Sequence, residues 1–319
     1  MHYYATIRAM STRLVFMGSP EFALPTLQVL AEAPYLLVGV VTQPDRPAGR
    51  GRKLTPPPIK TLALDLGLPV IQPARLKEPA AIAQLQEWAP DLIVVTAYGQ
   101  ILRPAVLDLP QHGCLNVHAS LLPRWRGAAP IQAAILHGDP QTGITIMRMD
   151  PGLDTGPILN QRTIAIYPDE DAGSLANRLA ELGAKLLAET LPGYLAGEIQ
   201  PQPQDESQVT YAPMLSKEEG RLNFNQPAES LARRVRAFTP WPGAYTLWQG
   251  QPLKILRAHA AHRSAEPTSP RNPGTHANHG GLPAIKANPG LLILDEVQPA
   301  GKRAMSGEVF LHGARGWDD

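Results

Sequence analysis

Short apolar runs alternate with amphipathic stretches over the first two thirds of the chain. The runs that predict buried strands lie at residues 14–17, 35–43, 66–74, 91–99, 143–150 and 158–166. Apolar residues spaced three and four apart predict helices after residue 21, around 81–90 and over 171–197. Strands that alternate with helices indicate βαβ units, and runs without alternation fit strands covered on both faces. We therefore expect an α/β domain with a parallel sheet.

The last third of the chain has a different pattern. Residues 198–212 are polar and rich in Pro, which is typical of a linker, and residues 229–248 predict one helix, a Pro-rich turn and a strand. Further short strands predict a small β-rich domain, in which the polar stretch 262–281 is expected to be a mobile loop. The predicted division is a disordered tail at 1–12, a catalytic domain at 13–197, a linker at 198–212 and a C-terminal domain at 213–319.

Composition narrows the class of protein. The single cysteine, Cys114, excludes an internal disulfide and a Cys-rich metal site. A net charge of +1 means that a nucleic-acid partner would have to meet a local basic patch. No apolar run approaches the roughly 18 residues that span a bilayer, and the N-terminus has no apolar core of a secretory signal. We expect no membrane partner and a cytoplasmic location.

Three segments lie at the carboxyl ends of predicted strands, where the sites of open parallel sheets form, and they are therefore candidate sites. The first, Gly18-Ser19-Pro20, has one glycine, so a tight turn is favoured over phosphate binding. The second begins at Asn116 and includes His118, and the third centres on Asp154.

Asn116 and His118 are two residues apart on a predicted strand, so their side chains point to the same side. An amide and an imidazole can both stabilise the oxyanion of a carbonyl under attack. Asp154 lies between Gly152 and Gly156, whose backbone can make close approaches. Taken singly, each side chain could equally be a satisfied polar residue at a strand end or in a turn. Together, without a nucleophilic Ser or Cys, they fit direct transfer between two bound substrates.

Longer motifs carry a specific resemblance. The string NVHASLLPRWRGAAPIQ, followed by LDTG, resembles the formyltransferases that use 10-formyltetrahydrofolate. VTQPDRPAGRGRKLTPPPIK, RAFTPWPGA and VQPAGKRAMSG are similar to the methionyl-tRNA formyltransferases within that superfamily. The likeness runs from about residue 13 to 317. It implies a Rossmann-like N-terminal domain and a small, OB-like β-barrel after it.

The resemblance also implies roles for individual residues. Asn116, His118 and Asp154 would be catalytic, in moving a formyl group from 10-formyltetrahydrofolate to the α-amine of methionyl-initiator tRNA, without a metal. The expected folate contacts are Ser120, Leu121, Leu122 and Pro123. The expected tRNA contacts are Arg46, Arg50, Arg52, Lys53, Lys217, Lys302 and Arg303. The expected enzyme is a monomer.

Some features depart from the family pattern, and some rival functions share part of it. Met214 stands where many relatives have Lys, and 262–281 is more polar than the corresponding strand-forming segment. A sugar-nucleotide or glycinamide ribonucleotide formyltransferase would share the three catalytic residues but would not need the basic loop that the Gly and Pro content predicts at residues 44–60. A non-catalytic RNA-binding protein is a further alternative. A zinc hydrolase is disfavoured, because His112, His118 and His137 lack ligand spacing.

Overall fold

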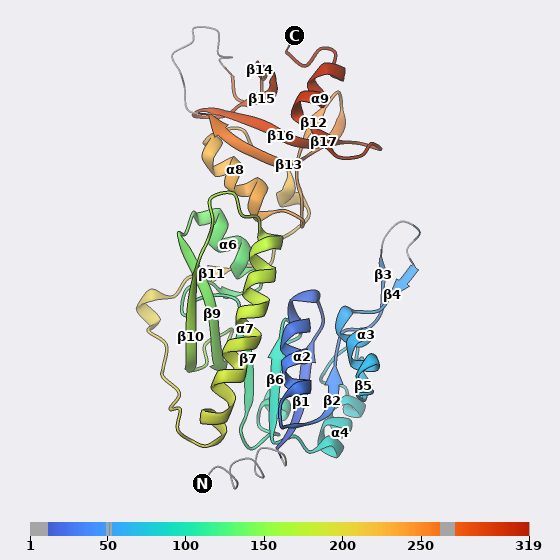
Figure 1. Ribbon diagram of the computed structural model, residues 1–319, viewed down its shortest axis with the longest axis vertical. Coiled ribbons are helices and arrows are strands. Elements are labelled where there is room, and N and C mark those ends of the chain that lie inside the picture. Colours follow the sequence, from blue (N-terminus) through green and yellow to red (C-terminus); the bar gives the residue numbers. More distant parts are fainter. Residues whose placement is uncertain (1–11, 49–50, 52, 262–271, 319) are drawn as a thin grey trace. The chain divides into compact units, whose positions relative to one another are not determined.

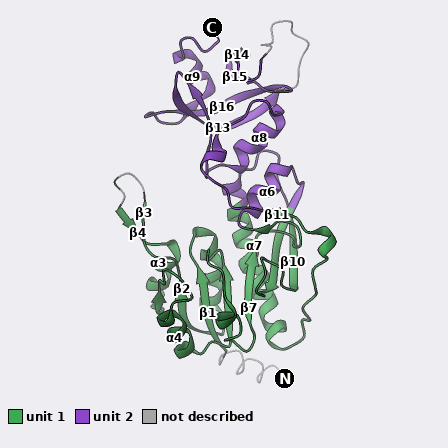
Figure 2. Ribbon diagram, turned by 180° about the vertical axis from the view of Figure 1, so that it is seen from behind, with its two compact units in different colours: residues 1–127, 142–164, 176–211 green, residues 128–141, 165–175, 212–319 purple. Residues whose placement is uncertain are grey.

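A computed structural model describes residues 12–48, 51, 53–261 and 272–318 (Figure 1). The chain divides into two compact units, which Figure 2 shows in different colours. Unit 1 comprises residues 1–127, 142–164 and 176–211, and unit 2 comprises 128–141, 165–175 and 212–319. The predicted domain limits differ from this division chiefly around residues 128–141, which lie in unit 2, and those limits stay a prediction.

Unit 1 is built on a seven-stranded sheet in the order β10-β9-β7-β6-β1-β2-β5 (Figure 1). Its strands are β1 (Arg13–Gly18), β2 (Leu36–Val41), β5 (Val70–Ile71), β6 (Leu92–Thr96), β7 (Cys114–His118), β9 (Gln141–Arg148) and β10 (Ile158–Ala165). The ladders that join β5, β2, β1, β6 and β7 are all parallel. This mixed α/β sheet confirms the predicted Rossmann-like fold class.

Six strands of this sheet overlap the predicted apolar runs, and β7 is the strand expected from the Asn116 and His118 pair. All five residues of β6 and all five of β7 are buried. The sheet departs from the expected parallel direction at β9, which pairs with β7 in the antiparallel direction. Apolar content alone cannot reveal this reversal, because a strand buried on both faces has the same pattern in either direction.

Three helices of the α/β part, which begin at Leu24, Pro79 and Ala172, lie close to where the pattern predicts them, whereas the helices at Pro58 and Pro104 were not predicted. These helices are α2 (Leu24–Glu32), α3 (Pro58–Asp65), α4 (Pro79–Trp88), α5 (Pro104–Leu107) and α7 (Ala172–Leu195), with a 3-10 helix, η1, at Glu21–Ala23. Pro occupies the first or second position of α2, α3, α4 and α5. Pro is favoured there because the amide hydrogen that it lacks has no partner within the helix.

The basic segment 44–60 is not the simple loop that its Gly and Pro content predicts. Strands β3 (Arg46–Ala48) and β4 (Lys53–Thr55) pair as an antiparallel hairpin, and α3 begins at Pro58. The expectation of a loop is therefore wrong for residues 46–48, 53–55 and 58–60. Residues 49, 50 and 52 lie outside the described residues.

Unit 2 contains an antiparallel sheet in the order β12-β13-β16-β15-β14, with β17 paired to β16. Its elements are α6 (Pro130–His137), η3 (Glu218–Gly220), α8 (Ala228–Ala237), β12 (Ala244–Trp248), β13 (Gln251–Ala261), β14 (His276–His279), β15 (Leu282–Lys286), β16 (Leu291–Pro299), β17 (Met305–Ser306) and α9 (Gly307–Gly313). The antiparallel sheet agrees with the predicted β-rich C-terminal domain.

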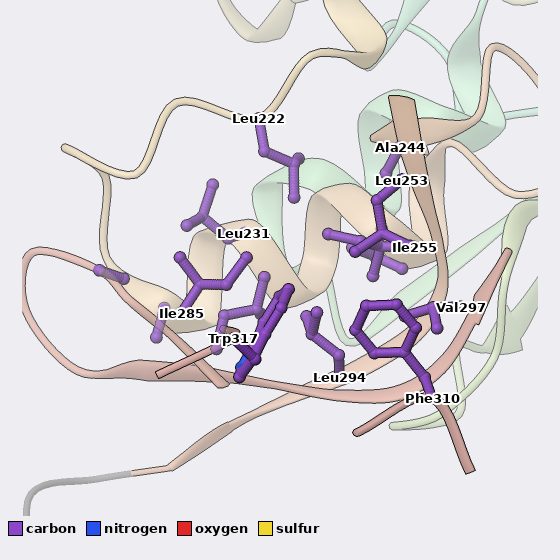
Figure 3. Close-up of a cluster of buried hydrophobic side chains, with 14 of the residues drawn as sticks. Leu222, Leu231, Ala244, Leu253, Ile255, Ile285, Leu294, Val297, Phe310 and Trp317 are labelled. Carbon is purple, nitrogen blue, oxygen red and sulfur yellow. The ribbon is translucent and has the colours of Figure 1, made fainter. Parts of the chain in front are cut away.

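A single apolar core joins α8, α9 and the sheet of unit 2. Figure 3 shows Leu231 of α8 and Phe310 of α9 facing the sheet residues Ile255 and Leu294, all of them buried. Trp317 fills the centre of this cluster, and its indole N–H donates to the carbonyl of Ala277 at 2.9 Å. Because Ala277 belongs to β14, the expectation of a loop over 262–281 is wrong for 276–279; residues 262–271 lie outside the described part of the chain.

The segment predicted to be a linker makes close contacts within unit 1. Gln202 pairs with Ile158 as an isolated β-bridge, and η2 (Glu206–Gln208) follows, before the short strand β11 (Tyr211–Ala212). Its polar composition therefore supplies hydrogen-bonding groups to unit 1. Among the described residues, no helix is both long and apolar enough to cross a membrane.

Candidate active site

The end of β7 carries the Asn-x-His pair. Asn116 and His118 are 9% and 6% exposed, so their polar groups lie almost wholly inside the protein. β7 is held on one side by β6, through the pair Val95 and Asn116, and on the other by β9, through His118 and Thr145. Because alternate residues of a strand share a side, this double pairing fixes both polar side chains in one direction.

Asp154 lies in the turn between β9 and β10, and its backbone is left-handed, with φ at 52°. Asp and Asn adopt this conformation more readily than most residues other than Gly. A side chain at Gly156 would collide with the carbonyl oxygen of Arg148, so the chain can fold back onto β9 only with glycine there. Asp150 braces the same turn by accepting hydrogen bonds from the Gly152 N–H at 3.0 Å and the Thr155 hydroxyl at 2.6 Å.

The structure brings the three predicted catalytic side chains together. The carboxylate of Asp154 is 3.7 Å from Nδ1 of His118, and its other oxygen is 3.5 Å from Nδ2 of Asn116. The strongest hydrogen bond to this carboxylate comes from the backbone N–H of Gly127, at 2.8 Å. At 3.5 and 3.7 Å these side-chain contacts are too long for strong hydrogen bonds. The polar atoms of Asn116 and His118 that face Asp154 can therefore still bind another group.

The hydrogen bond of His118 to the main chain determines which ring nitrogen carries a proton. Nε2 lies 3.1 Å from the carbonyl oxygen of Trp125. A carbonyl only accepts hydrogen bonds, so Nε2 must carry the hydrogen. In the neutral ring, Nδ1 then presents its lone pair on the side of Asp154. His118 is thus set up to accept a proton at Nδ1.

The turn after β7 is tied to the neighbouring strands. The Ser120 hydroxyl donates to the Arg124 carbonyl at 2.6 Å, and the Leu122 N–H donates to the Thr145 hydroxyl at 3.1 Å. Gln161 donates to the carbonyl of Leu122 at 2.8 Å. Ser120 and Leu122 are buried with their polar groups in use, which leaves Leu121 and Pro123 as the half-buried members of this segment. The expected folate contacts stay a prediction.

The predicted tRNA contacts fall in both units. Arg46 and Lys53 are exposed on the β3–β4 hairpin of unit 1, while Arg50 and Arg52 lie outside the described residues. In unit 2 the exposed residues of this set are Lys217, Lys302 and Arg303. Lys60 of the same basic segment pairs with Asp45 at 2.7 Å and is therefore committed to an internal contact.

Three contributors to the site were missed from the sequence. They are the N–H of Gly127, the carbonyl of Trp125 and the side chain of Gln204, which bonds the main chain of Asp154 at 2.8 Å. Backbone groups leave no signal in side-chain patterns, and Gln204 lies 50 residues away in a segment predicted to be a linker. In the part of the chain that the structure describes, no cluster of His, Cys, Asp or Glu could hold a metal ion.

An Asn and a His at the carboxyl end of a parallel strand, with an Asp beside both of them, are typical of an α/β enzyme of the group-transfer class. The chain belongs to the formyl transferase family. The family model described as "Formyl transferase" matches residues 13–191, and the one described as "Formyl transferase, C-terminal domain" matches 214–315.

Curated relatives resemble the chain over almost all of its length. It is 50% identical to the methionyl-tRNA formyltransferase of Myxococcus xanthus over 301 residues, covering 94% of this chain and 95% of that protein. Identity to the methionyl-tRNA formyltransferase of Methylococcus capsulatus is 51%, with 94% and 96% covered. Among solved structures, the methionyl-tRNA formyltransferase from Clostridium thermocellum is 16% identical, with a TM-score of 0.54 over 80% of this chain and 96% of that one. This last likeness shows the fold alone.

Proposed function

We propose that this formyltransferase moves the formyl group of 10-formyltetrahydrofolate to the α-amine of methionine esterified to initiator tRNA. The observation that carries the proposal is the meeting of Asn116, His118 and Asp154 in a chain about 50% identical to methionyl-tRNA formyltransferases. Each of the three side chains has a role that its geometry suits.

His118 serves as the base for the attacking amine. A free α-amine has a pKa of about 8, so a sizeable fraction of the amine is neutral at physiological pH. As the amine nitrogen bonds to the formyl carbon, it loses a proton to Nδ1 of His118, while Nε2–H stays on the Trp125 carbonyl. The imidazolium that results is a donor at both nitrogens, and it can return the proton to the departing folate nitrogen when the C–N bond breaks.

Asn116 stabilises the oxyanion that forms on the former formyl oxygen. Its Nδ2 has only a long contact of 3.5 Å with Asp154, so a better acceptor can capture the donor. One well-placed donor of this kind lowers the barrier by roughly 3 kcal/mol. Before it passes its proton to the folate nitrogen, the protonated Nδ1 of His118 can donate to the same oxygen.

Asp154 stabilises the positive charge on His118. Its carboxylate lies 3.7 Å from Nδ1 and is 15% exposed, so little water screens the attraction. The N–H of Gly127 holds the carboxylate in place at 2.8 Å. Asp154 therefore favours proton transfer from the amine without leaving its position.

The folate donor is assigned to the turn after β7. Leu121 and Pro123 offer half-buried apolar contact, and Ser120 and Leu122 keep the turn rigid through their internal hydrogen bonds. When bound, the donor supplies an activated formyl group. The residues fit that role because an apolar wall lies directly after the polar pair on β7.

The tRNA is assigned to the exposed cations. Arg46, Arg50, Arg52 and Lys53 of unit 1, and Lys217, Lys302 and Arg303 of unit 2, would bind phosphates and read shape. In this proposal the enzyme is a cytoplasmic monomer. Its catalytic domain comprises residues 13–197, a connecting segment comprises 198–212, and the domain that contacts tRNA comprises 213–319.

The proposal is tested by incubating the protein with 10-formyltetrahydrofolate labelled in the formyl group. The acceptors are methionyl-initiator tRNA, methionyl-elongator tRNA, an amino-sugar nucleotide and glycinamide ribonucleotide. We expect label on the initiator tRNA alone. Label on a small amine instead would move the chain to another branch of the family, and no transfer to any acceptor would contradict the proposal.

A further inference from the structure

A single glutamine joins the connecting segment to the turn that carries Asp154. The amide nitrogen of Gln204 donates to the carbonyl of Asp154 at 2.8 Å and to the carbonyl of Gly156 at 2.7 Å. Its amide oxygen accepts from Nε of Arg126 at 3.0 Å. Arginine can only donate, so the orientation of this amide is fixed by its partner. Both hydrogens of Gln204 are thus committed to the turn.

Arg126 is a buried and multiply hydrogen-bonded partner for that amide. Its side chain is 1% exposed, and its two terminal nitrogens donate to Glu206 at 2.6 and 3.2 Å. Its backbone N–H donates to the carbonyl of Thr210 at 2.9 Å. The next residue, Gly127, donates to the carboxylate of Asp154. One stretch of chain therefore holds Asp154 by its side chain and, through Gln204, by its main chain.

This double hold matters because the backbone of Asp154 is in an uncommon conformation. With φ at 52°, the turn persists only when its surroundings stabilise it. Without Gln204 the two carbonyls would lose their donors, and the turn would relax. The distance between Asp154 and His118 is already 3.7 Å. A displacement of about 1 Å at such a site can cost about a hundredfold in rate.

We propose that Gln204 is a positioning residue for Asp154, with Arg126 fixing the direction of its amide. The inference rests on the proposed function, since it assigns Asp154 to formyl transfer. It adds that the segment between the two family-matched regions, 13–191 and 214–315, completes the active site. Gln204 itself touches neither substrate in this role.

The experiment measures kcat and both KM values for Gln204→Met, which keeps the length of the side chain and removes its hydrogen bonds. The matched control is Gln202→Met, because Gln202 lies on the same segment, is exposed, and directs its side-chain amide to the carbonyl of Gln200 at 3.2 Å, whereas its contacts with Ile158 are made by the main chain and survive the substitution. We expect Gln204→Met to lower kcat by ten- to a hundredfold, with both KM values within threefold of wild type. The control should stay within twofold in every constant.

A second variant and a second background guard against a general loss of structure. Gln204→Glu retains a partner for Arg126 but offers no hydrogen to the two carbonyls, so it should lose kcat as Gln204→Met does. In an Asp154→Ala background, adding Gln204→Met should change the residual rate by less than twofold, because the group that it positions is gone.

Wild-type kcat in either Gln204 variant would overturn the inference, as would an equal fractional loss with and without Asp154. A loss confined to KM would also overturn it. An inactive wild-type protein would instead reject the proposed function, so the two failures can be told apart.

Discussion

The cluster of Asn116, His118 and Asp154 and the β3–β4 hairpin, both in unit 1, differ in how far their polar side chains are buried. Asn116, His118 and Asp154 are 9%, 6% and 15% exposed, and several backbone hydrogen bonds hold them. On the hairpin, Arg46 and Lys53 are exposed, and Leu54 is 70% exposed. The hydrogen bond from Arg46 to Gln43, at 3.2 Å, is itself at the surface.

The difference suits the roles that we propose for the two regions. Charge that develops on one carbonyl oxygen is stabilised best by donors already in place in a dry site, because nothing then has to reorganise during the reaction. Phosphates are spread over a long surface, and exposed cations bind them largely through charge. Changes in the cluster should therefore lower the rate of transfer, and changes on the hairpin should weaken binding.

The largest expected effect is that of Asn116→Ala. Removing the amide should lower kcat by about a hundred- to a thousandfold, because the oxyanion loses a preorganised donor. The affinity for tRNA should stay within threefold, as measured by filter binding on the same preparation. A variant that transfers formyl at half the wild-type rate would show that Asn116 is only a satisfied polar residue.

The next effect is on stability and concerns Gly156→Ala. The added methyl group would press on the carbonyl of Arg148, which is part of the backbone of β9 and cannot rotate away. Overpacking of this kind costs about 1–3 kcal/mol of unfolding free energy, measured by denaturant titration. The control is Gly313→Ala at the end of α9, where a Cβ has open space and stability should hardly change.

Neutralising the hairpin should have a moderate effect that is confined to binding. Arg46→Ala combined with Lys53→Ala should raise the KM for tRNA about tenfold. The slope of log Kd against log salt concentration should become smaller by about one to two, because up to two phosphate contacts are lost. The control is Arg75→Ala combined with Lys77→Ala, which replaces two exposed cations before α4. This control should leave the KM for tRNA within twofold of wild type. A fall in kcat at saturating tRNA would contradict the proposal that the hairpin affects binding alone and the cluster affects the rate of transfer.

The smallest effect concerns Cys114, at the start of β7. Burial raises the pKa of this thiol to about 12, so it stays protonated and unreactive at pH 8. A thiol reagent such as DTNB should not label the native protein within an hour, whereas protein unfolded in guanidinium should take up one equivalent. Rapid labelling of the native state would mean that β7, and with it Asn116 and His118, opens readily.

The sequence predicted the parts of this molecule that depend on side-chain periodicity. The long helix α7 and the strand β6 follow from apolar spacing, and the family motifs point to Asn116, His118 and Asp154. The structure brings these three together across 38 residues of chain. Their catalytic roles, and the assignments to folate and tRNA, stay predictions until the variants are measured.

Other parts depend on interactions that composition does not reveal. Gly and Pro around residues 44–60 predict a loop, but cross-strand hydrogen bonds make a hairpin there. His276–His279 looks too polar for a strand, yet it pairs with β15 and packs against Trp317, on which the His276 ring stacks at 4.0 Å. Gln204 lies in a segment that resembles a linker, and only the fold shows that it contacts the turn of Asp154.

The most direct test of the account compares transfer and binding in one variant, with Asn116, His118 and Asp154 all replaced by alanine. Single-turnover transfer of labelled formyl from 10-formyltetrahydrofolate is measured at saturating methionyl-initiator tRNA, and tRNA affinity is measured on the same preparation. We expect the rate of transfer in the triple variant to fall at least a thousandfold below that of the wild type, while the Kd for tRNA stays within threefold of the wild-type value. Transfer near the wild-type rate would contradict the account.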